Sequence, residues 1–195
     1  MVATSPQHSS AATILVLGPA RSGKSEWAEY LAKESQQSVI YIATARTDPA
    51  DLEWQARIQQ HRQRRPANWQ TLEVPWDLAA TIQTADANTC LLVDSLGTWL
   101  TNGLEQDDEN WNAQVKSLLN ELQHATATVI LVAEEVGWGI VPAYPIGRVF
   151  RDRMGALVRS ISALADTVYL VAGGHALNLS QLGTPLPTQI RGAKL

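Results

Sequence analysis

The sequence predicts an α/β domain with a mostly parallel sheet flanked by helices, and three observations support this prediction. Short apolar runs of strand length alternate along the chain with longer segments of helical periodicity. Such alternation is typical of right-handed β-α-β units, which build parallel sheets. The first apolar run is followed at once by a glycine-rich turn and an amphipathic segment. The length of 195 residues suits one domain of this kind.

In the first half of the chain we expect strands and helices in alternation. The segment Lys24–Ser35 carries aromatic and apolar residues at the i, i+3, i+4 spacing of a helical face. The polar segment 51–64 is rich in Gln and Arg and stops before Pro66, which is typical of an exposed helix. A further helix begins at Asp77. The expected strands are the runs 13–17, 39–43, 71–74 and 90–93.

In the second half the same alternation continues and then weakens beyond Gly173. We expect a helix from the acidic stretch 105–109 through Ala125, a strand at 128–133, a helix at 147–165 and a strand at 167–172. The small, polar residues 1–12 are predicted to be a disordered tail, and 183–195 a loose C-terminal tail. The predicted single domain therefore covers residues 13–182.

Composition excludes several classes of function. The formal net charge is −4, and no run of basic residues could track a nucleic-acid backbone, so we expect no nucleic-acid partner. No apolar stretch approaches the roughly 20 residues of a membrane span, and we expect none. Cys90 is the single cysteine, which excludes a disulfide framework and fits a cytoplasmic location.

The strongest motif is a phosphate-binding loop. It matches G-x-x-x-x-G-K-[ST] and lies between an apolar strand and an amphipathic helix, as its chemistry requires. Gly23 allows a tight turn that aims backbone N–H groups at phosphates, and Lys24 is expected to neutralise their oxygens. Ser25, together with Asp94 at the end of a buried run, is expected to hold Mg²⁺. The expected phosphate ligands are Gly18, Pro19, Ala20, Arg21, Ser22, Gly23, Lys24 and Ser25.

The segment 57–66 allows two interpretations from its residues alone. It gathers four arginines and His61 in a chain that is otherwise acidic. It is either a solvated helix face or a basic helix that reaches the triphosphate. In the second case His61 is a phosphate ligand or a nucleophile.

A second candidate loop, Glu134–Pro142, follows a predicted core strand at the edge where such sheets bind ligands. Its two adjacent carboxylates and its flexible glycines suit a substrate loop, although an ordinary acidic turn has the same composition. Trp99 and Trp138 are expected at loop edges, where a flat ligand could stack on them.

Several segments together resemble one family, the bifunctional adenosylcobinamide kinase/adenosylcobinamide-phosphate guanylyltransferases of cobalamin biosynthesis. The resemblance keeps the family's order and spans about 14–171. The stretches that carry it are LGPARSGKSEWAE, YIATA, RIQQHRQRRPANWQTLEVP, LLVDSLGTWLTN, EEVGWGIVP and FRDRMG.

The resemblance implies a RecA-like P-loop nucleotide-binding fold and two reactions. ATP or GTP first phosphorylates a hydroxyl of adenosylcobinamide, the corrinoid substrate. His61 then attacks GTP, and the GMP–histidine intermediate passes GMP to the phosphorylated cobinamide. His61 and Lys24 would thus be catalytic. The resemblance also implies a homotrimer, and nucleotide contacts from Thr44, Ala45, Arg46, Arg62, Gln63, Arg64, Arg65, Glu73 and Asp94.

Two alternatives follow from the phosphate loop alone. The chain could be another small-molecule kinase with no covalent intermediate, in which case His61 would carry no adduct. It could instead be a RecA-like nucleotide-dependent switch or ATPase, for which only Glu134 or Glu135 could position water. In that case the RIQQHR segment would have no evident role.

Overall fold

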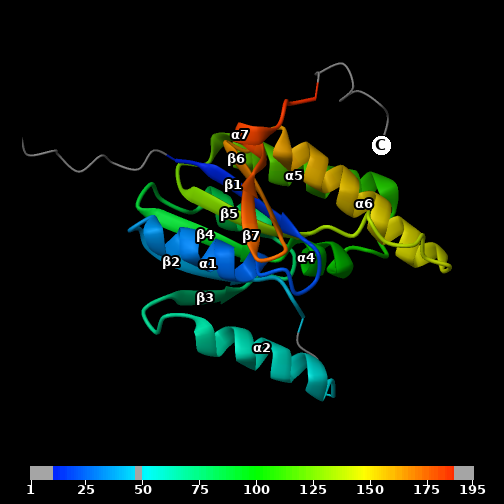
Figure 1. Ribbon diagram of the computed structural model, residues 1–195, viewed down its shortest axis with the longest axis horizontal. Helices are drawn as coiled ribbons and strands as arrows, with labels where there is room; N and C mark the ends of the chain where they lie inside the picture. The colour runs from blue at the N-terminus through cyan, green and yellow to red at the C-terminus, as the bar shows by residue number, and fades with distance from the viewer. Residues whose placement is uncertain (1–10, 47–49, 187–195) are drawn as a thin grey trace, which may run out of the picture.

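The protein forms one seven-stranded sheet with helices on both faces, as the computed structural model shows (Figure 1). The structure describes residues 11–46 and 50–186, with the exception of the side chains of Trp54, Arg57 and Gln60. The strand order is β3-β2-β4-β5-β1-β6-β7, and every pairing is parallel except the one between β6 and β7. One strand, β5, separates β1 from β4, which is the arrangement of a RecA-like P-loop domain.

The elements follow the predicted alternation closely. The strands are β1 Thr13–Gly18, β2 Ser38–Ala43, β3 Gln70–Glu73, β4 Thr89–Asp94, β5 Thr128–Glu134, β6 Thr167–Ala172 and β7 His175–Asn178. The helices are α1 Lys24–Glu34, α2 Leu52–Arg64, α3 Leu78–Gln83, α4 Leu96–Asn102, α5 Asp108–His124, α6 Pro145–Ser162 and α7 Leu179–Leu182.

The central strands are apolar throughout because both faces of the sheet are covered. Successive side chains of a strand point to opposite faces. In β4, Leu91 and Val93 join the core beneath α3 to α6, whereas Cys90 and Leu92 pack on the side of α1. The same division holds along β1 and β5. A strand buried on both sides therefore has a continuous apolar sequence. Such apolar runs predicted β1, β4 and β5.

Three elements differ from the expectation or were absent from it. The short helix α4 begins directly after Asp94, where Ser95 caps it by accepting a hydrogen bond from the Thr98 N–H. Beyond Gly173 the chain forms the antiparallel strand β7 and the one-turn helix α7. Apolar periodicity was too short in these segments to indicate them. The predicted tails, 1–12 and 183–195, lie mostly outside the described residues.

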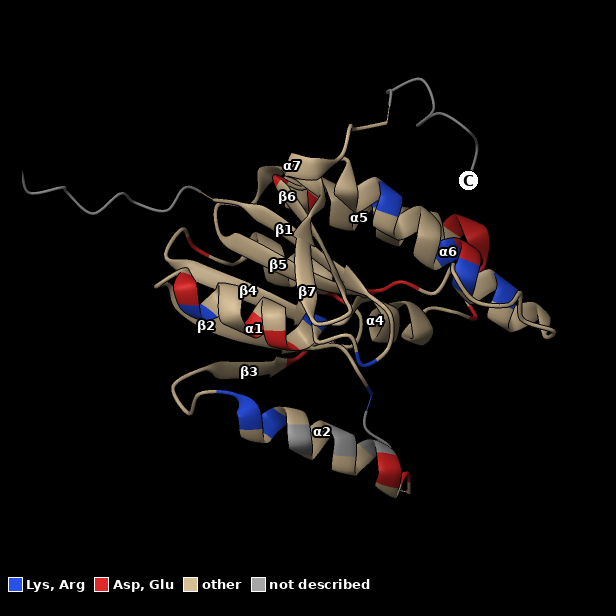
Figure 2. Cartoon of the chain, viewed as in Figure 1, with Lys and Arg blue, Asp and Glu red and all other residues tan. Residues whose placement is uncertain are grey.

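Helix α2 lies at the rim of the molecule on the side of the edge strand β3 (Figure 1), and its C-terminal end contacts α1 and the end of β4. Its basic residues gather at its C-terminal end, near the chain's entry into β3 (Figure 2). No helix in the described parts of the chain has the length and apolar character needed to cross a membrane.

Candidate functional site

The phosphate loop joins β1 to α1 and has the backbone geometry of a tight anion-binding turn. Gly23 adopts a left-handed conformation with φ of 93° and ends the loop as the N-cap of α1. Gly18 leaves no room for a side chain, because a Cβ atom there would come within 2.6 Å of the Val171 carbonyl oxygen. Gly18 therefore lets the loop pack closely against β6, while Gly23 provides the left-handed turn into the N-terminus of α1, where backbone N–H groups can bind an anion.

Lys24 and Ser25 open helix α1 and are both nearly buried, each with 8% of its surface exposed. The Lys24 ammonium lies across the loop, and its Nζ donates to the Pro19 carbonyl at 3.4 Å. This places a positive charge and a hydroxyl side by side at the wall of a pocket. A triphosphate bound to the loop would meet both groups.

Asp94 ends β4 at the same edge of the sheet. The Tyr41 hydroxyl donates to Asp94 Oδ2 at 3.0 Å, which orients the carboxylate. Burial, together with the neighbouring Asp94 carboxylate, raises the pKa of Tyr41, so the phenol remains a proton donor at neutral pH. Asp94 and Ser25 line one pocket and offer hard oxygen ligands. Their chemistry therefore fits a magnesium ion.

Helix α2 brings His61 into this pocket, where its Nδ1 lies 3.8 Å from Asp94 Oδ2. Two arginines in the next turns hold the helix in position. Arg64 forms ion pairs with Glu26 and Glu29 of α1 and lies 3.2 Å from His61 Nδ1. Arg65, which follows the last residue of the helix, ties this end of α2 to the sheet.

Arg65 makes three contacts at the sheet edge. Its guanidinium lies 3.8 Å from the centre of the Tyr41 ring, a cation–π arrangement. Its Nε donates to the His61 carbonyl at 3.3 Å, and Nη1 donates to Thr71 of β3 at 3.1 Å. Arg65 therefore connects the backbone of His61 directly to β2 and β3.

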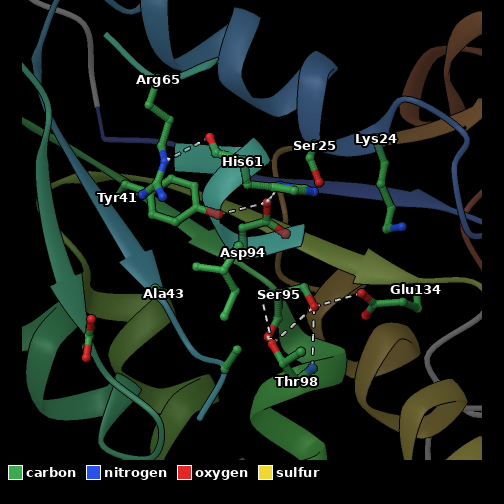
Figure 3. A pocket seen from close by; sticks show the side chains of 13 residues that line it. Lys24, Ser25, Tyr41, Ala43, His61, Arg65, Asp94, Ser95, Thr98 and Glu134 are labelled. Atoms are coloured by element: carbon green, nitrogen blue, oxygen red, sulfur yellow. Dashed lines mark hydrogen bonds and ion pairs between the residues drawn. The ribbon is translucent and has the colours of Figure 1, made fainter. Parts of the chain in front are cut away.

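The resulting pocket lies between α2 and the carboxyl ends of the parallel strands (Figure 3). Ligands of open α/β sheets bind at this edge. The pocket is lined by Lys24, Ser25, Tyr41, Ala43, Ala45, Ile58, His61, Arg65, Glu73, Asp94, Ser95, Thr98 and Glu134.

A network of hydroxyl groups forms part of the pocket wall. Thr44 hydrogen-bonds to Thr98 and to the backbone of Ser95, and is itself fully buried. The Ser95 hydroxyl donates to Glu134 Oε1 at 2.7 Å. The network thus links the ends of β2, β4 and β5 through the first turn of α4 (Figure 3).

Some of the site residues predicted from the sequence line this pocket, and others do not. Lys24, Ser25, Ala45, His61, Arg65, Glu73 and Asp94 line it. The side chain of Thr44 instead belongs to the buried network, and Arg64 holds α2 against α1. The exposed residues Arg46, Arg62 and Gln63 are not among the lining residues. Gly18 to Gly23 form the turn beside the pocket.

Of the two tryptophans expected at loop edges, only Trp138 is exposed, at 67%. The expectation for Trp99 was wrong. Trp99 lies inside α4 with 1% of its surface exposed and packs against Trp76 and Trp111. Its indole N–H donates to the Trp76 carbonyl. Polar residues surround Trp99 in the sequence because α4 has only one buried face, and they led to the wrong prediction that Trp99 lies at a loop edge.

Sequence reasoning did not assign Tyr41, Ser95 or Thr98 to the site. Tyr41 appears in the sequence as an ordinary residue of a buried strand, and the other two as polar residues after Asp94. Only the pairing of β2 with β4 brings Tyr41 beside Asp94. Glu134 belonged to the candidate substrate loop, and the structure places it in the pocket itself.

Comparison with known proteins gives a consistent picture. The chain is 44% identical over 174 residues to a protein of Pseudomonas aeruginosa named bifunctional adenosylcobalamin biosynthesis protein CobP, covering 88% of this chain and 98% of that one. It is 40% identical over 182 residues to the Escherichia coli protein named bifunctional adenosylcobalamin biosynthesis protein CobU, covering 85% of this chain and 98% of that one.

Among solved structures, a Pyrococcus horikoshii OT3 protein from a structural project shares the fold, with a TM-score of 0.56 at 10% identity. The match covers 94% of this chain and 91% of the other. The family described as cobinamide kinase/cobinamide phosphate guanyltransferase matches residues 14–179, nearly the whole described structure. The chain therefore belongs to the cobinamide kinase/cobinamide phosphate guanyltransferase family.

Proposed function

We propose that this protein phosphorylates adenosylcobinamide with ATP or GTP and then transfers GMP from GTP to the product through a GMP–His61 intermediate. The observation that carries this proposal is the shared pocket. It joins a phosphate loop to an imidazole that comes from a different helix. Membership of the family supports both reactions.

The guanylyl transfer divides into two displacements. In the first, an imidazole nitrogen of His61 attacks the α-phosphorus of GTP. A P–N bond forms, the P–O bond to the β-phosphate breaks, and pyrophosphate leaves with the electron pair. In the second, a phosphate oxygen of adenosylcobinamide phosphate attacks the same phosphorus. The P–N bond breaks, His61 is regenerated, and adenosylcobinamide-GDP forms.

The cations around His61 suit this chemistry. Lys24 at the loop would neutralise β- and γ-oxygens, and Arg65 would face negative charge that enters the pocket from the side of α2. Glu73, at the end of β3, could accept hydrogen bonds from guanine N–H groups. The predicted contacts from Arg46, Arg62 and Gln63 would require a nucleotide that extends beyond the lining residues.

Magnesium is the metal that we propose for the site, held by the Ser25 hydroxyl and the Asp94 carboxylate. When bound, it would neutralise negative charge on the phosphates. Asp94 also accepts the Tyr41 hydrogen bond, which would keep one carboxylate oxygen oriented while the other faces the pocket.

The decisive experiment is incubation with GTP labelled at the α-phosphorus, followed by denaturation. The protein should retain label that survives base and is lost in acid, as expected for a phosphoramidate. His61→Ala should retain none. His124→Ala is the matched control, because His124 ends α5 and is absent from the pocket lining.

Each alternative function gives a different result in this experiment. A kinase without a covalent intermediate would leave no label on the wild-type protein, although it would still transfer the γ-phosphate. A nucleotide-dependent switch would hydrolyse GTP in the absence of any corrinoid acceptor. Label that persists in His61→Ala would assign the adduct to another residue and contradict the proposal.

We further propose a homotrimer, on the grounds of family resemblance, and a cytoplasmic location, because the chain has a single cysteine. The segment between β5 and α6, with the first turn of α6, supports association, because it exposes the apolar side chains of Trp138, Ile140, Val141, Tyr144 and Ile146. Light scattering coupled to size-exclusion chromatography should report three times the mass of the chain. Ile140→Asp should reduce that mass, whereas a monomeric wild-type protein would contradict the proposal.

A further inference from the structure

We infer that Glu134 is the general base of the kinase reaction. The two reactions would then depend on two different residues of one pocket. This inference rests on the proposed function, because it assigns a residue to one of its two steps. In this scheme His61 serves guanylyl transfer, and Glu134 deprotonates the hydroxyl that receives the γ-phosphate.

The sheet places Glu134 beside the start of the phosphate loop. In the parallel register of β1 and β5, Glu134 is the partner of Gly18. The N–H of Glu135 donates to the Gly18 carbonyl at 3.0 Å and continues this pairing into the loop. A carboxylate at this position lies next to the chain that would bind the phosphates.

Two neighbours hold the Glu134 carboxylate in position. The Ser95 hydroxyl donates to its Oε1 at 2.7 Å, and Ser95 is oriented by Thr98. Gly97 provides the space, since a methyl group at this residue would overlap the carboxylate. A base must be held within hydrogen-bond reach of its proton, and these contacts provide such positioning.

The second oxygen of Glu134 has no partner. Oε2 is enclosed and makes no hydrogen bond within the described structure. A buried oxygen without a donor is costly, so such an atom in a pocket calls for an explanation. Rotation about the terminal torsion of a carboxylate is broad and exchanges its two oxygens. Oε2 packs against Gly97, so a Glu134 oxygen would meet the hydroxyl of a bound acceptor once the carboxylate turns about this torsion, and that hydroxyl would supply a donor.

The other carboxylates near the pocket are less suited to this role. Asp94 accepts the Tyr41 hydroxyl and lies beside His61 Nδ1. Glu135 does not line the pocket, and its Oε1 accepts from the N–H of Gly137 at 3.2 Å. Glu73 lies at the end of β3, which is separated from β1 by β2, β4 and β5.

A Glu134 oxygen takes the proton of the acceptor hydroxyl while the hydroxyl oxygen attacks the γ-phosphorus. The new O–P bond forms as the P–O bond to the β-phosphate breaks, and the nucleoside diphosphate leaves with the electron pair. Glu134 then releases its proton to water.

The test compares Glu134→Gln with Glu135→Gln in both half-reactions. Gln keeps the size of the side chain and an oxygen that can accept from Ser95, so the pocket should remain assembled. Kinase kcat, measured with γ-labelled ATP and adenosylcobinamide, should fall roughly 10²-fold or more with little change in KM for ATP. Labelling of His61 by GTP should persist, and Glu135→Gln should match wild type in both assays.

A pH profile and a conservative variant separate catalysis from positioning. The acid limb of the kinase kcat profile should disappear in Glu134→Gln, and Glu134→Asp should recover part of the rate. Equal loss of both half-reactions, or unchanged kinase kcat, would overturn the assignment. A wild-type protein that labels His61 but transfers no γ-phosphate would contradict the kinase half of the proposed function, and the assignment with it.

Discussion

The two sides of the candidate site are built in different ways. On one side, the phosphate loop joins a central strand to α1, whose Ala28 and Ala32 are fully buried against the sheet. On the other side, α2 lies at the rim of the molecule (Figures 1 and 2) and carries His61 to the end of β4. Arg64 and Arg65 tie this helix to α1 and the sheet through polar and cation–π contacts.

Because of this difference, the part of the site that binds phosphate and the part that positions the His61 imidazole are held by different kinds of interaction. Both ends of the phosphate loop are anchored in the core, because β1 and α1 pack buried apolar side chains against their neighbours. The position of His61 depends on a few ion pairs and hydrogen bonds at half-exposed side chains, each of which contributes little free energy. Substitutions on the two sides should therefore have different consequences.

The largest effect should come from the core beneath α4. Trp99→Ala should lower the free energy of unfolding by about 3–5 kcal/mol, because it removes a buried indole and the hydrogen bond that its N–H donates to the Trp76 carbonyl. Urea denaturation followed by circular dichroism would measure this loss. Trp138→Ala is the control, since its ring is largely exposed, and it should unfold near the wild-type midpoint. Equal stability of the two variants would contradict the assignment of Trp99 to the core.

Removing the cation of the phosphate loop should affect activity more than stability. Lys24→Ala should lower kcat/KM of both reactions roughly 10²–10³-fold, the cost of one preorganised electrostatic contact. Steady-state assays and nucleotide titration would measure the loss, with Lys33→Ala, at the exposed end of α1, as the control. Normal turnover by Lys24→Ala would show that the loop does not bind the triphosphate.

Removing the ion pairs that hold α2 against α1 should impair guanylyl transfer more than the kinase reaction. Arg64→Ala removes both ion pairs to α1, and the rate of His61 labelling by GTP should fall about tenfold, the equivalent of about 1.4 kcal/mol. The kinase rate and the unfolding midpoint should change little. Lys116→Ala, on the distant helix α5, controls for the loss of a surface charge. A parallel fall in both rates would indicate that α2 and the phosphate loop act as one unit.

The smallest effect concerns the pH dependence of stability at the contact between α1 and α2. Burial raises the pKa of Glu29 above its ordinary value of 4.5, although Arg64 opposes the shift. The folded state therefore binds a proton more tightly than the unfolded state, and this contribution to stability is lost as pH rises from 4.5 through the raised pKa.

Glu29→Gln should remove this contribution, so the variant should gain stability relative to wild type as pH increases. Thermal unfolding across a pH series would measure the difference, with the exposed Glu34→Gln as the control. A stability difference between Glu29→Gln and wild type that stays constant with pH would contradict the assignment.

Much of the fold could be predicted because its signals are local. The apolar runs that became β1, β4 and β5, and the periodicity of α1 and α5, reflect neighbours within a few residues along the chain. The phosphate loop is equally local, since one continuous segment supplies the strand, the turn and the helix. Segment 175–182 has too short a pattern to indicate β7 and α7, which form against β6.

The residues alone determined that the chain holds a phosphate loop, a basic segment with His61 and a carboxylate at the end of a buried strand. Tertiary structure decided which of these meet. The order of β1, β5 and β4 brings Glu134 and Asp94 to one edge, and the contacts of Arg64 and Arg65 bring His61 to the same pocket. The physical reason is that strand order and helix docking depend on packing between residues far apart in sequence, which no local pattern records.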